Sequence, residues 1–264
     1  MDSVTLDARY QAAFARLGLT SFGAIVRRFH PVEPSGKTTV LVTPSQLGIG
    51  SGESLGVFCK LYHYQSPSWR FVGRASKARC EFRNYAVFEG LSVACAERIA
   101  CGEERDWLGR LRRAFILTKA IANAGTLVEF VQAFCPDRAA PESRALRATL
   151  FSQLAAMTRR IHDAQFFHHD LVWRNVLVEH APPVGPKLWW IDCPRGQFDR
   201  WSPLRHRRRL KDLASLDKTA MKLCTRGERL QFLKHYLCKS TLDDAVKRLA
   251  RETVAYGSRR WPRG

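Results

Sequence analysis

The chain has 264 residues, of which 45% are hydrophobic, and its 43 Lys and Arg against 24 Asp and Glu give a formal net charge of +19. This length suits one large domain or two closely packed lobes, and the hydrophobic fraction excludes a chain that is disordered throughout. The charge predicts a polyanionic partner, for which nucleic acid, an anionic membrane surface and a phosphorylated substrate are all candidates.

The cysteines and the N-terminus indicate a reduced, cytoplasmic environment. Eight cysteines are present, but none forms a Cys-x-x-Cys pair, so neither a zinc site nor a thioredoxin-like motif is expected. Residues 1–7 lack the basic start and apolar core of a secretory signal peptide, and no disulfide framework is expected. Because no run approaches the ~18 apolar residues of a membrane span, we expect a soluble or at most a peripheral protein.

The first half of the chain alternates between helical and strand patterns. A helical region breaks at Gly18 and restarts with Thr20 or Ser21 as its N-cap. Prolines and a glycine interrupt the chain over residues 31–36, and a glycine-rich turn follows over residues 48–52. The elements predicted here are a helical region over 6–29, strands over 38–42 and 55–62, a polar loop over 63–78, a helix over 77–100, and short strands over 114–118 and 127–131.

The second half is predicted to be mainly helical. Apolar residues recur at steps of three and four, which is typical of an amphipathic helix, at Leu146, Leu150, Leu154, Met157 and Ile161. Two short apolar strands follow over residues 175–179 and 187–192, joined by residues 181–186. From residue 210 onward the pattern is helical again.

Residues 167–178, FHHDLVWRNVLV, carry the strongest chemical signal in the chain. They match the catalytic loop of protein kinases, His-x-Asp-Leu followed by an Asn five residues after the Asp. In such a loop the carboxylate must face the acceptor hydroxyl, while the amide must reach a metal ion on the nucleotide phosphates. We therefore predict that Asp170 is the catalytic residue and Asn175 a metal ligand.

Two further segments supply the other groups that a phosphotransferase needs. An apolar strand ends in Asp192, where a kinase-like architecture places the carboxylate ligand of Mg²⁺. A second strand, VFCK, ends in Lys60, and Glu81 in the following predicted helix can pair with it to hold the ammonium on the α and β phosphates of ATP. Because these elements occur in the kinase order, we predict an α+β, bilobal protein-kinase-like fold that uses ATP and Mg²⁺.

These motifs also resemble one family, the bacterial lipopolysaccharide core kinases of the WaaP/InaA type, which phosphorylate heptose or Kdo. Their metal strand reads Ile-Asp-x-x-Arg instead of Asp-Phe-Gly, and residues 191–195 here read IDCPR. The resemblance covers roughly residues 55–240. The segments that carry it are Lys60, residues 78–84, 168–170, 191–195, 208–216 and 227–236.

The glycine-rich turn departs from the kinase pattern. Residues 48–52 do not match Gly-x-Gly-x-x-Gly and begin only twelve residues before Lys60. A phosphate-covering loop lies farther upstream, between the first two strands. We therefore interpret this turn as a hinge between the second and third strands, which leaves the nucleotide-covering loop either degenerate or near residues 43–50.

Asp212 and His168 are expected to support the catalytic loop. Asp212 is either a surface residue among basic neighbours or, as the resemblance implies, a buried carboxylate that accepts hydrogen bonds from the backbone of the loop. His168 is expected to pack and hydrogen-bond within the loop. A general base at His168 or His169 is the alternative to Asp170.

Basic residues are candidates for binding an anionic substrate or membrane. Arg205 and Arg208 belong to a cluster over residues 205–211, and each basic residue near an anionic membrane contributes roughly 1 kcal/mol. Arg195 follows the metal carboxylate closely, so it is assigned either to the substrate or to a salt bridge with Asp192 or a glutamate. A second basic cluster is formed by Arg70, Arg74, Lys77 and Arg79.

We predict an N-terminal lobe over residues 1–118 and a mainly helical C-terminal lobe over residues 119–264. By resemblance, the chain transfers a phosphoryl group to a heptose or Kdo of the lipopolysaccharide inner core, at the cytoplasmic face of an anionic inner membrane. The alternatives are a kinase for protein or another small molecule, and an inactive kinase-like scaffold. A nucleic acid partner is not expected, because the sequence has no recognition-helix, RNP or zinc pattern.

Overall fold

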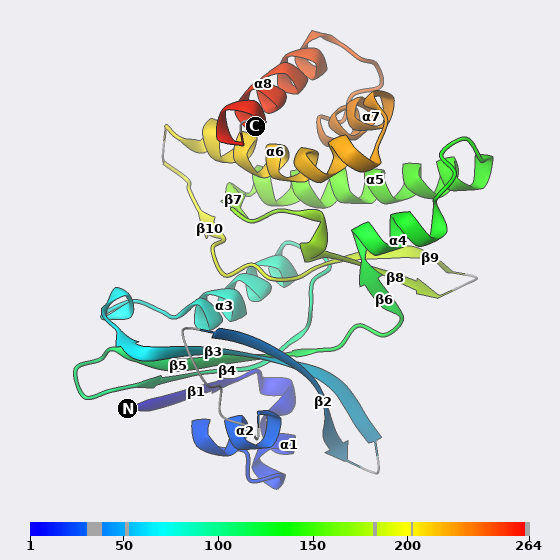
Figure 1. The fold of residues 1–264 in the computed structure, drawn as a ribbon. Coiled ribbons are helices and arrows are strands. Elements are labelled where there is room, and N and C mark those ends of the chain that lie inside the picture. The colour runs from blue at the N-terminus through cyan, green and yellow to red at the C-terminus, as the bar shows by residue number, and fades with distance from the viewer. Residues whose placement is uncertain (31–38, 51–52, 182–183, 202, 262–264) are drawn as a thin grey trace. The chain divides into compact units, whose positions relative to one another are not determined.

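The computed structural model describes residues 1–30, 39–50, 53–181, 184–201 and 203–261 (Figure 1). The chain divides into two compact units, unit 1 of Met1–Val87 with Ala96–Ile121 and unit 2 of Phe88–Cys95 with Ala122–Gly264. The predicted interruption at residues 31–36 and two connection tips, residues 51–52 and 182–183, lie outside the described residues. Within the described ranges, no helix has the length and apolar character needed to cross a membrane.

Unit 1 is built on a five-stranded antiparallel sheet with the strand order β1-β4-β5-β3-β2. Its strands are β1 (Asp2–Leu6), β2 (Thr39–Gly50), β3 (Glu53–Ser68), β4 (Arg98–Arg105) and β5 (Leu111–Lys119). Strands β2 and β3 pair from Thr39 with His63 to Gly50 with Glu53. Residues 43–50, one suggested position of a nucleotide-covering loop, are therefore part of a paired strand.

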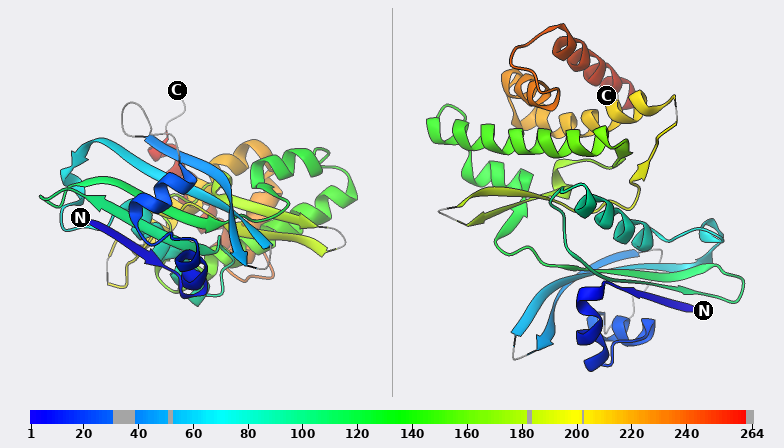
Figure 2. Two further views of the ribbon diagram at one scale, coloured as in Figure 1. Left: turned by 90° about the horizontal axis from the view of Figure 1, so that it is seen from below. Right: turned by 180° about the vertical axis from the view of Figure 1, so that it is seen from behind.

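Helices cover both faces of this sheet (Figures 1 and 2). The helices α1 (Gln11–Arg16) and α2 (Phe22–Phe29) lie on one face, and α3 (Lys77–Gly90) lies on the other. Side chains alternate along β3, so Cys59 and Leu61 join the buried cluster under α1 and α2. Lys60 consequently points to the opposite face, toward α3. Two short 3₁₀ turns, Ala8–Tyr10 and Trp69–Phe71, complete the unit.

The structure corrects four sequence-based expectations. The polar loop predicted over residues 63–78 starts later, because β3 extends to Ser68. The predicted helical region began at residue 6, but residues 2–6 form β1, which pairs with β4. The helix expected over residues 77–100 ends at Gly90, and β4 begins at Arg98. Residues 127–131 are helical instead of extended, because Thr126 and Glu129 form a capping box that starts α4 (Leu127–Phe134). The predicted restart at Ser21 is confirmed, since its hydroxyl accepts a hydrogen bond from Ala24 N.

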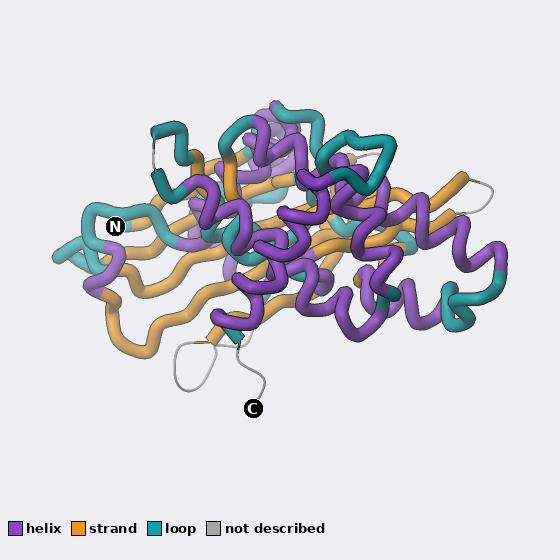
Figure 3. Tube along the Cα trace, turned by 90° about the horizontal axis from the view of Figure 1, so that it is seen from above, coloured by secondary structure: helices purple, strands orange, loops and turns teal. Residues whose placement is uncertain are grey.

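Unit 2 is mainly helical, with two small sheets. Figure 3 colours the helices of the whole chain purple and the strands orange. Its elements are β6 (Ala124–Thr126), α4, α5 (Pro141–Asp163), β7 (Phe166–Phe167), the 3₁₀ turn η3 (Trp173–Asn175), β8 (Val176–Ala181), β9 (Val184–Trp190), β10 (Gln197–Phe198), α6 (Arg205–Leu223), α7 (Arg226–Tyr236) and α8 (Asp244–Arg260). Strands β6, β8 and β9 form one antiparallel sheet, and β7 pairs with β10. The predicted amphipathic helix is confirmed as part of α5. The α+β class is thus confirmed.

A buried arginine joins α5 to α7. Arg147 is 1% exposed, and its Nε donates to Glu228 Oε1 at 2.5 Å. Its Nη2 donates to the carbonyl of Leu223, the last residue of α6, at 2.6 Å. Glu228 also caps α7 through Thr225. The guanidinium therefore donates to acceptors at two helix ends, the last carbonyl of α6 and a carboxylate in the first turn of α7.

Replacing Arg147 with Met should lower the unfolding free energy by about 3 kcal/mol, because Glu228 and the end of α6 lose their donor inside the fold. Denaturant unfolding followed by circular dichroism measures this loss. The control is Lys247→Met, whose ion pair with Asp244 has side chains that are 60% and 100% exposed. That variant should stay within about 0.5 kcal/mol of the parent. Equal losses in the two variants would contradict a structural role for Arg147.

Candidate active site

Unit 1 contains a buried ion pair between Lys60 on β3 and Glu81 on α3. The Lys60 ammonium lies 3.1 and 3.0 Å from the two carboxylate oxygens of Glu81. The side chains are only 16% and 3% exposed. The pairing predicted from the sequence is therefore present, and it joins the sheet to the helix.

Two tyrosines that the sequence reading missed complete this arrangement. The hydroxyl of Tyr62 donates to Glu81 Oε2 at 3.3 Å, and that of Tyr85 donates to Oε1 at 2.9 Å. A signal existed for both, because Tyr62 lies two residues after Lys60 on the same strand face and Tyr85 lies one helical turn after Glu81. With donors on both oxygens, the carboxylate holds the ammonium in one position.

Unit 2 contains the predicted catalytic loop, which is anchored by a carboxylate from α6. Asp212 is completely buried, and its two oxygens accept hydrogen bonds from the backbone N–H of His168 at 2.7 Å and of His169 at 2.8 Å. Burial alone would raise the pKa of Asp212, but the hydrogen bond from His162 and the nearby imidazoles hold this pKa below its ordinary value. The geometry agrees with the buried alternative for Asp212 and excludes a surface position.

A chain of hydrogen bonds that no motif indicated supports Asp212 in turn. His162 Nε2, at the end of α5, lies 3.4 Å from Asp212 Oδ2, and His162 Nδ1 lies 2.8 Å from the Tyr236 hydroxyl. That hydroxyl accepts from Arg209 Nε at 2.5 Å. The hydroxyl can then donate to Nδ1, which leaves the proton on Nε2 to face the carboxylate. Arg209, part of the basic cluster expected to face substrate or membrane, is thus directed inward.

His168 is held inside the loop, as predicted. Its ring is fully buried, stacked on Phe88 with centroids 6.1 Å apart and packed against Trp190 at 5.2 Å. Its Nδ1 accepts a weak hydrogen bond from Asp170 N at 3.4 Å. Burial lowers the pKa of His168, although Asp212, Asp170 and Asp192 oppose this shift. A neutral, enclosed imidazole suits a structural role better than proton transfer to a substrate.

The backbone brings Asp170, Asn175 and the end of β9 together. Asn175 Nδ2 donates to the carbonyl of Asp170 at 2.9 Å. The carbonyl of Asn175 accepts from Ile191 N at 3.0 Å, which ties it to the residue before Asp192. Asp192 and His169 have φ angles of 57° and 65°, in the left-handed region. Such conformations cost about 1–3 kcal/mol each for residues other than glycine and concentrate at functional sites.

The oxygen donors of this segment fit a magnesium ion. Asn175 uses its amide nitrogen to bond the carbonyl of Asp170, and its Oδ1 and the Asp192 carboxylate are hard oxygen donors of the type that Mg²⁺ prefers. The described residues contain no group of three His, Cys, Asp or Glu side chains arranged to hold a metal.

A glycine is required immediately after this segment. A Cβ atom on Gly196 would collide with the ring of Phe166 and with Cys193 Sγ. Both contacting residues are fully buried, so neither can move aside at low cost. The close approach fixes the path of the chain that follows Asp192.

The three arginines assigned to substrate binding have different environments. Arg208 forms an ion pair with Asp199 at 3.0 Å. Arg195 and Arg205 are exposed, and neither forms an ion pair with any other residue in the described ranges.

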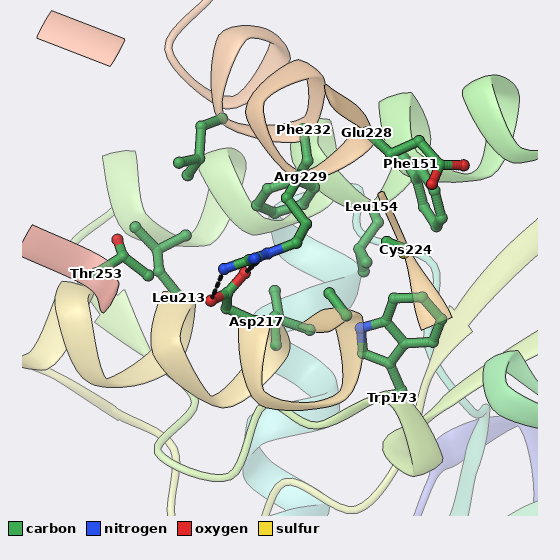
Figure 4. A pocket seen from close by; sticks show the side chains of 13 residues that line it. Phe151, Leu154, Trp173, Leu213, Asp217, Cys224, Glu228, Arg229, Phe232 and Thr253 are labelled. Atoms are coloured by element: carbon green, nitrogen blue, oxygen red, sulfur yellow. Dashed lines mark hydrogen bonds and ion pairs between the residues drawn. The ribbon is translucent and has the colours of Figure 1, made fainter. Parts of the chain in front are cut away.

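A small apolar cavity of about 40 Å³ lies behind the catalytic segment in unit 2 (Figure 4). Its walls include Leu154, Phe232 and Trp173, the last from η3, and an ion pair joins Asp217 to Arg229 at 2.6 Å. A space of this size holds a few water molecules at most. We interpret it as a packing gap beneath the loop.

Comparison with known proteins identifies relatives of this chain. Residues 61–236 match the model of the lipopolysaccharide kinase (Kdo/WaaP) family. A 3-deoxy-D-manno-octulosonic acid kinase of Haemophilus influenzae (strain PittEE) is 29% identical over 162 residues, 55% of this chain and 61% of that protein. The same kinase from strain PittGG is 28% identical over the same shares of the two chains. The matched part thus spans 61% of the length of these relatives.

A solved structure shares the fold across nearly the whole chain. It is described as WaaP in complex with acyl carrier protein, and it superposes with a TM-score of 0.69 at 24% sequence identity. The match covers 98% of this chain and 97% of that one.

The buried histidine makes stability depend on pH. The unfolded chain protonates His168 near its ordinary pKa of about 6.5, whereas the folded chain does so only at lower pH, so acidification from about pH 7 to about pH 5 should destabilise the fold. His169, whose pKa is also lowered chiefly by burial, acts in the same direction.

His168→Phe should reduce the slope of unfolding free energy against pH by up to about 1.4 kcal/mol per pH unit. Denaturant unfolding over a pH series measures this slope, and the control is His206→Phe, which replaces an exposed histidine. Identical slopes for the parent and His168→Phe would refute this account.

Proposed function

The chain belongs to the lipopolysaccharide kinase (Kdo/WaaP) family, and on this premise we propose that it is a bilobal, protein-kinase-like enzyme that phosphorylates a sugar of the lipopolysaccharide inner core with ATP. The observation that carries the proposal is the catalytic loop, where Asp212 holds two successive amides before Asp170 and Asn175 bonds the carbonyl of Asp170. Because the matching relatives are named as kinases of 3-deoxy-D-manno-octulosonic acid, Kdo is the favoured acceptor and heptose the second.

In the proposed reaction the acceptor oxygen attacks the γ-phosphorus of ATP in line with the bond to the β–γ bridging oxygen, which breaks. Asp170 orients the hydroxyl and receives its proton. Lys60, held by Glu81, contacts the α and β phosphates. Asn175 and Asp192 would hold Mg²⁺, which when bound neutralises charge on the phosphates. Positioning and electrostatics supply most of the rate in such transfers.

The same proposal assigns roles to the two parts of the chain and to its surface. Residues 1–118 would bind the nucleotide phosphates, and residues 119–264 would carry the catalytic loop and the metal ligands. The exposed positions of Arg195 and Arg205 support contact with an anionic acceptor. Arg208 would contribute beside Asp199. We place the enzyme at the cytoplasmic face of the inner membrane, where a peripheral contact with anionic lipid would bring it to its acceptor.

Asp170→Ala should lower turnover by about a hundredfold to ten-thousandfold, because it removes the group that orients and deprotonates the hydroxyl. The measurement is transfer of labelled phosphate from ATP to a Kdo-containing lipid A precursor, with a parallel arm in which EDTA removes Mg²⁺ and should also stop transfer. Asp163→Ala, an exposed carboxylate in α5, is the control. Full turnover in Asp170→Ala would move the role to His168 or His169. Transfer by the parent only to added protein would favour a protein kinase instead.

Lys60→Met and Glu81→Gln should be strongly non-additive. Each breaks the same ion pair, so the double variant should lose less catalytic efficiency than the sum of the two single losses, with a coupling energy of about 1–3 kcal/mol. The control cycle pairs Lys60→Met with Glu89→Gln on the exposed part of α3, where the losses should add. Additive losses for Lys60 and Glu81 would mean that their pairing has no part in nucleotide use.

A further inference from the structure

A second cavity in unit 2 borders the catalytic loop. It has a volume of about 320 Å³ and is lined by His169, Leu204, Arg207, Arg208, Lys211, Tyr256 and Arg260. A neighbouring hollow of about 580 Å³ shares three of these residues, Arg207, Tyr256 and Arg260. The walls therefore come from the loop, from the first turns of α6 and from the last turns of α8. The size matches the lower end of the range for small-molecule sites, about 300–1,000 Å³.

The lining carries an excess of positive charge. Four of its seven residues are Lys or Arg, and none is acidic. The nearest acids are already engaged, since Asp199 pairs with Arg208 at 3.0 Å and Asp212 accepts from the loop amides. Arg207, Lys211 and Arg260 form no ion pair with any residue of the described part of the chain. Such a gathering of cations without counter-charge is a site for an anion.

Two further features connect the cavity to the chemistry. Lys211 is partly buried, which lowers its pKa; Arg195 and Arg260 add to this shift, while Asp212 and Asp170 oppose it. The ammonium thus lies within the electrostatic reach of both Arg195 and Asp170. The ring nitrogens of His169 are shielded from solvent and have no hydrogen-bond partner among the described residues. His169 directly precedes Asp170, so a group bound here is held beside the catalytic carboxylate.

We infer that this cavity binds the anionic group of the acceptor sugar, the carboxylate of a sugar acid such as Kdo, with Lys211 and Arg260 as its main cationic ligands. The inference rests on the proposed function and specifies the substrate class, an acidic sugar whose hydroxyl is phosphorylated. The guanidinium and ammonium groups would donate charge-assisted hydrogen bonds to the carboxylate. Fixing the carboxylate would orient one hydroxyl toward Asp170.

The test compares binding of free Kdo with binding of its uncharged methyl ester by isothermal titration calorimetry on the full chain. The parent should bind Kdo about tenfold or more tightly than the ester. Lys211→Met and Arg260→Met should each weaken Kdo binding about tenfold and leave ester binding nearly unchanged. Lys222→Met, an exposed lysine at the far end of α6, should bind like the parent. In turnover assays the two cavity variants should raise the KM for the lipid-linked acceptor more than they lower kcat.

Two further probes, inorganic phosphate and anionic phospholipid vesicles, test whether the cavity binds an anion other than the sugar carboxylate. Inorganic phosphate should compete with Kdo in the parent, since both place anionic oxygens in the cavity. A parent affinity for Kdo that saturating phosphate leaves unchanged would overturn the assignment to this cavity. If Lys211→Met and Arg260→Met weakened binding to anionic phospholipid vesicles but not to Kdo, the assignment of the cavity to the acceptor would also be overturned. Equal affinity of the parent for Kdo and the ester would also overturn it. None of these binding results needs phosphoryl transfer, so a parent that binds Kdo selectively but transfers no phosphate would refute the proposed function alone.

Discussion

The hydrogen bonds from the backbone of His168 and His169 to Asp212 are the contacts on which the rest of unit 2 depends. A carboxylate with no exposed surface is expensive to bury, and it is stable only when its oxygens are fully used by donors. Here the donors belong to the loop that carries Asp170. The cost of burying the charge is therefore offset only when both loop amides reach Asp212, and the hydrogen bonds through His162 and Tyr236 extend this requirement to α5 and α7.

Unit 1 uses a buried carboxylate in a related way. Glu81 receives the Lys60 ammonium and two tyrosine hydroxyls, so its charge is compensated from the strand and from its own helix. The two carboxylates differ in the group that each one holds in place. Asp212 fixes backbone amides, and through them a loop, whereas Glu81 fixes a cation. In both units a carboxylate that takes no part in bond making sets the geometry of the group beside it.

The net charge of +19 is distributed unevenly between interior and surface. Arg147 and Arg209 are turned inward, where they satisfy Glu228 and the Tyr236 hydroxyl. Arginine suits such positions because its planar guanidinium can serve several acceptors at once. Around the cavity beside His169, Arg208 pairs with Asp199, whereas Arg207, Lys211 and Arg260 form no ion pair within the described part of the chain. The basic stretch over residues 205–211 thus contains both an inward-facing arginine, Arg209, and cations that line a cavity.

The sequence by itself determined the features that repeat at short range. The apolar steps of three and four predicted α5, and the spacing within the catalytic loop and between Lys60 and Glu81 predicted contacts that the fold contains. Other features needed the tertiary structure. Strand β1 exists because it pairs with β4, a partner about a hundred residues away. The contacts of Asp212 with His162 and of His162 with Tyr236 join residues 50 and 74 positions apart. No local periodicity encodes such pairings, because which donor meets a buried carboxylate is decided only when distant helices pack together.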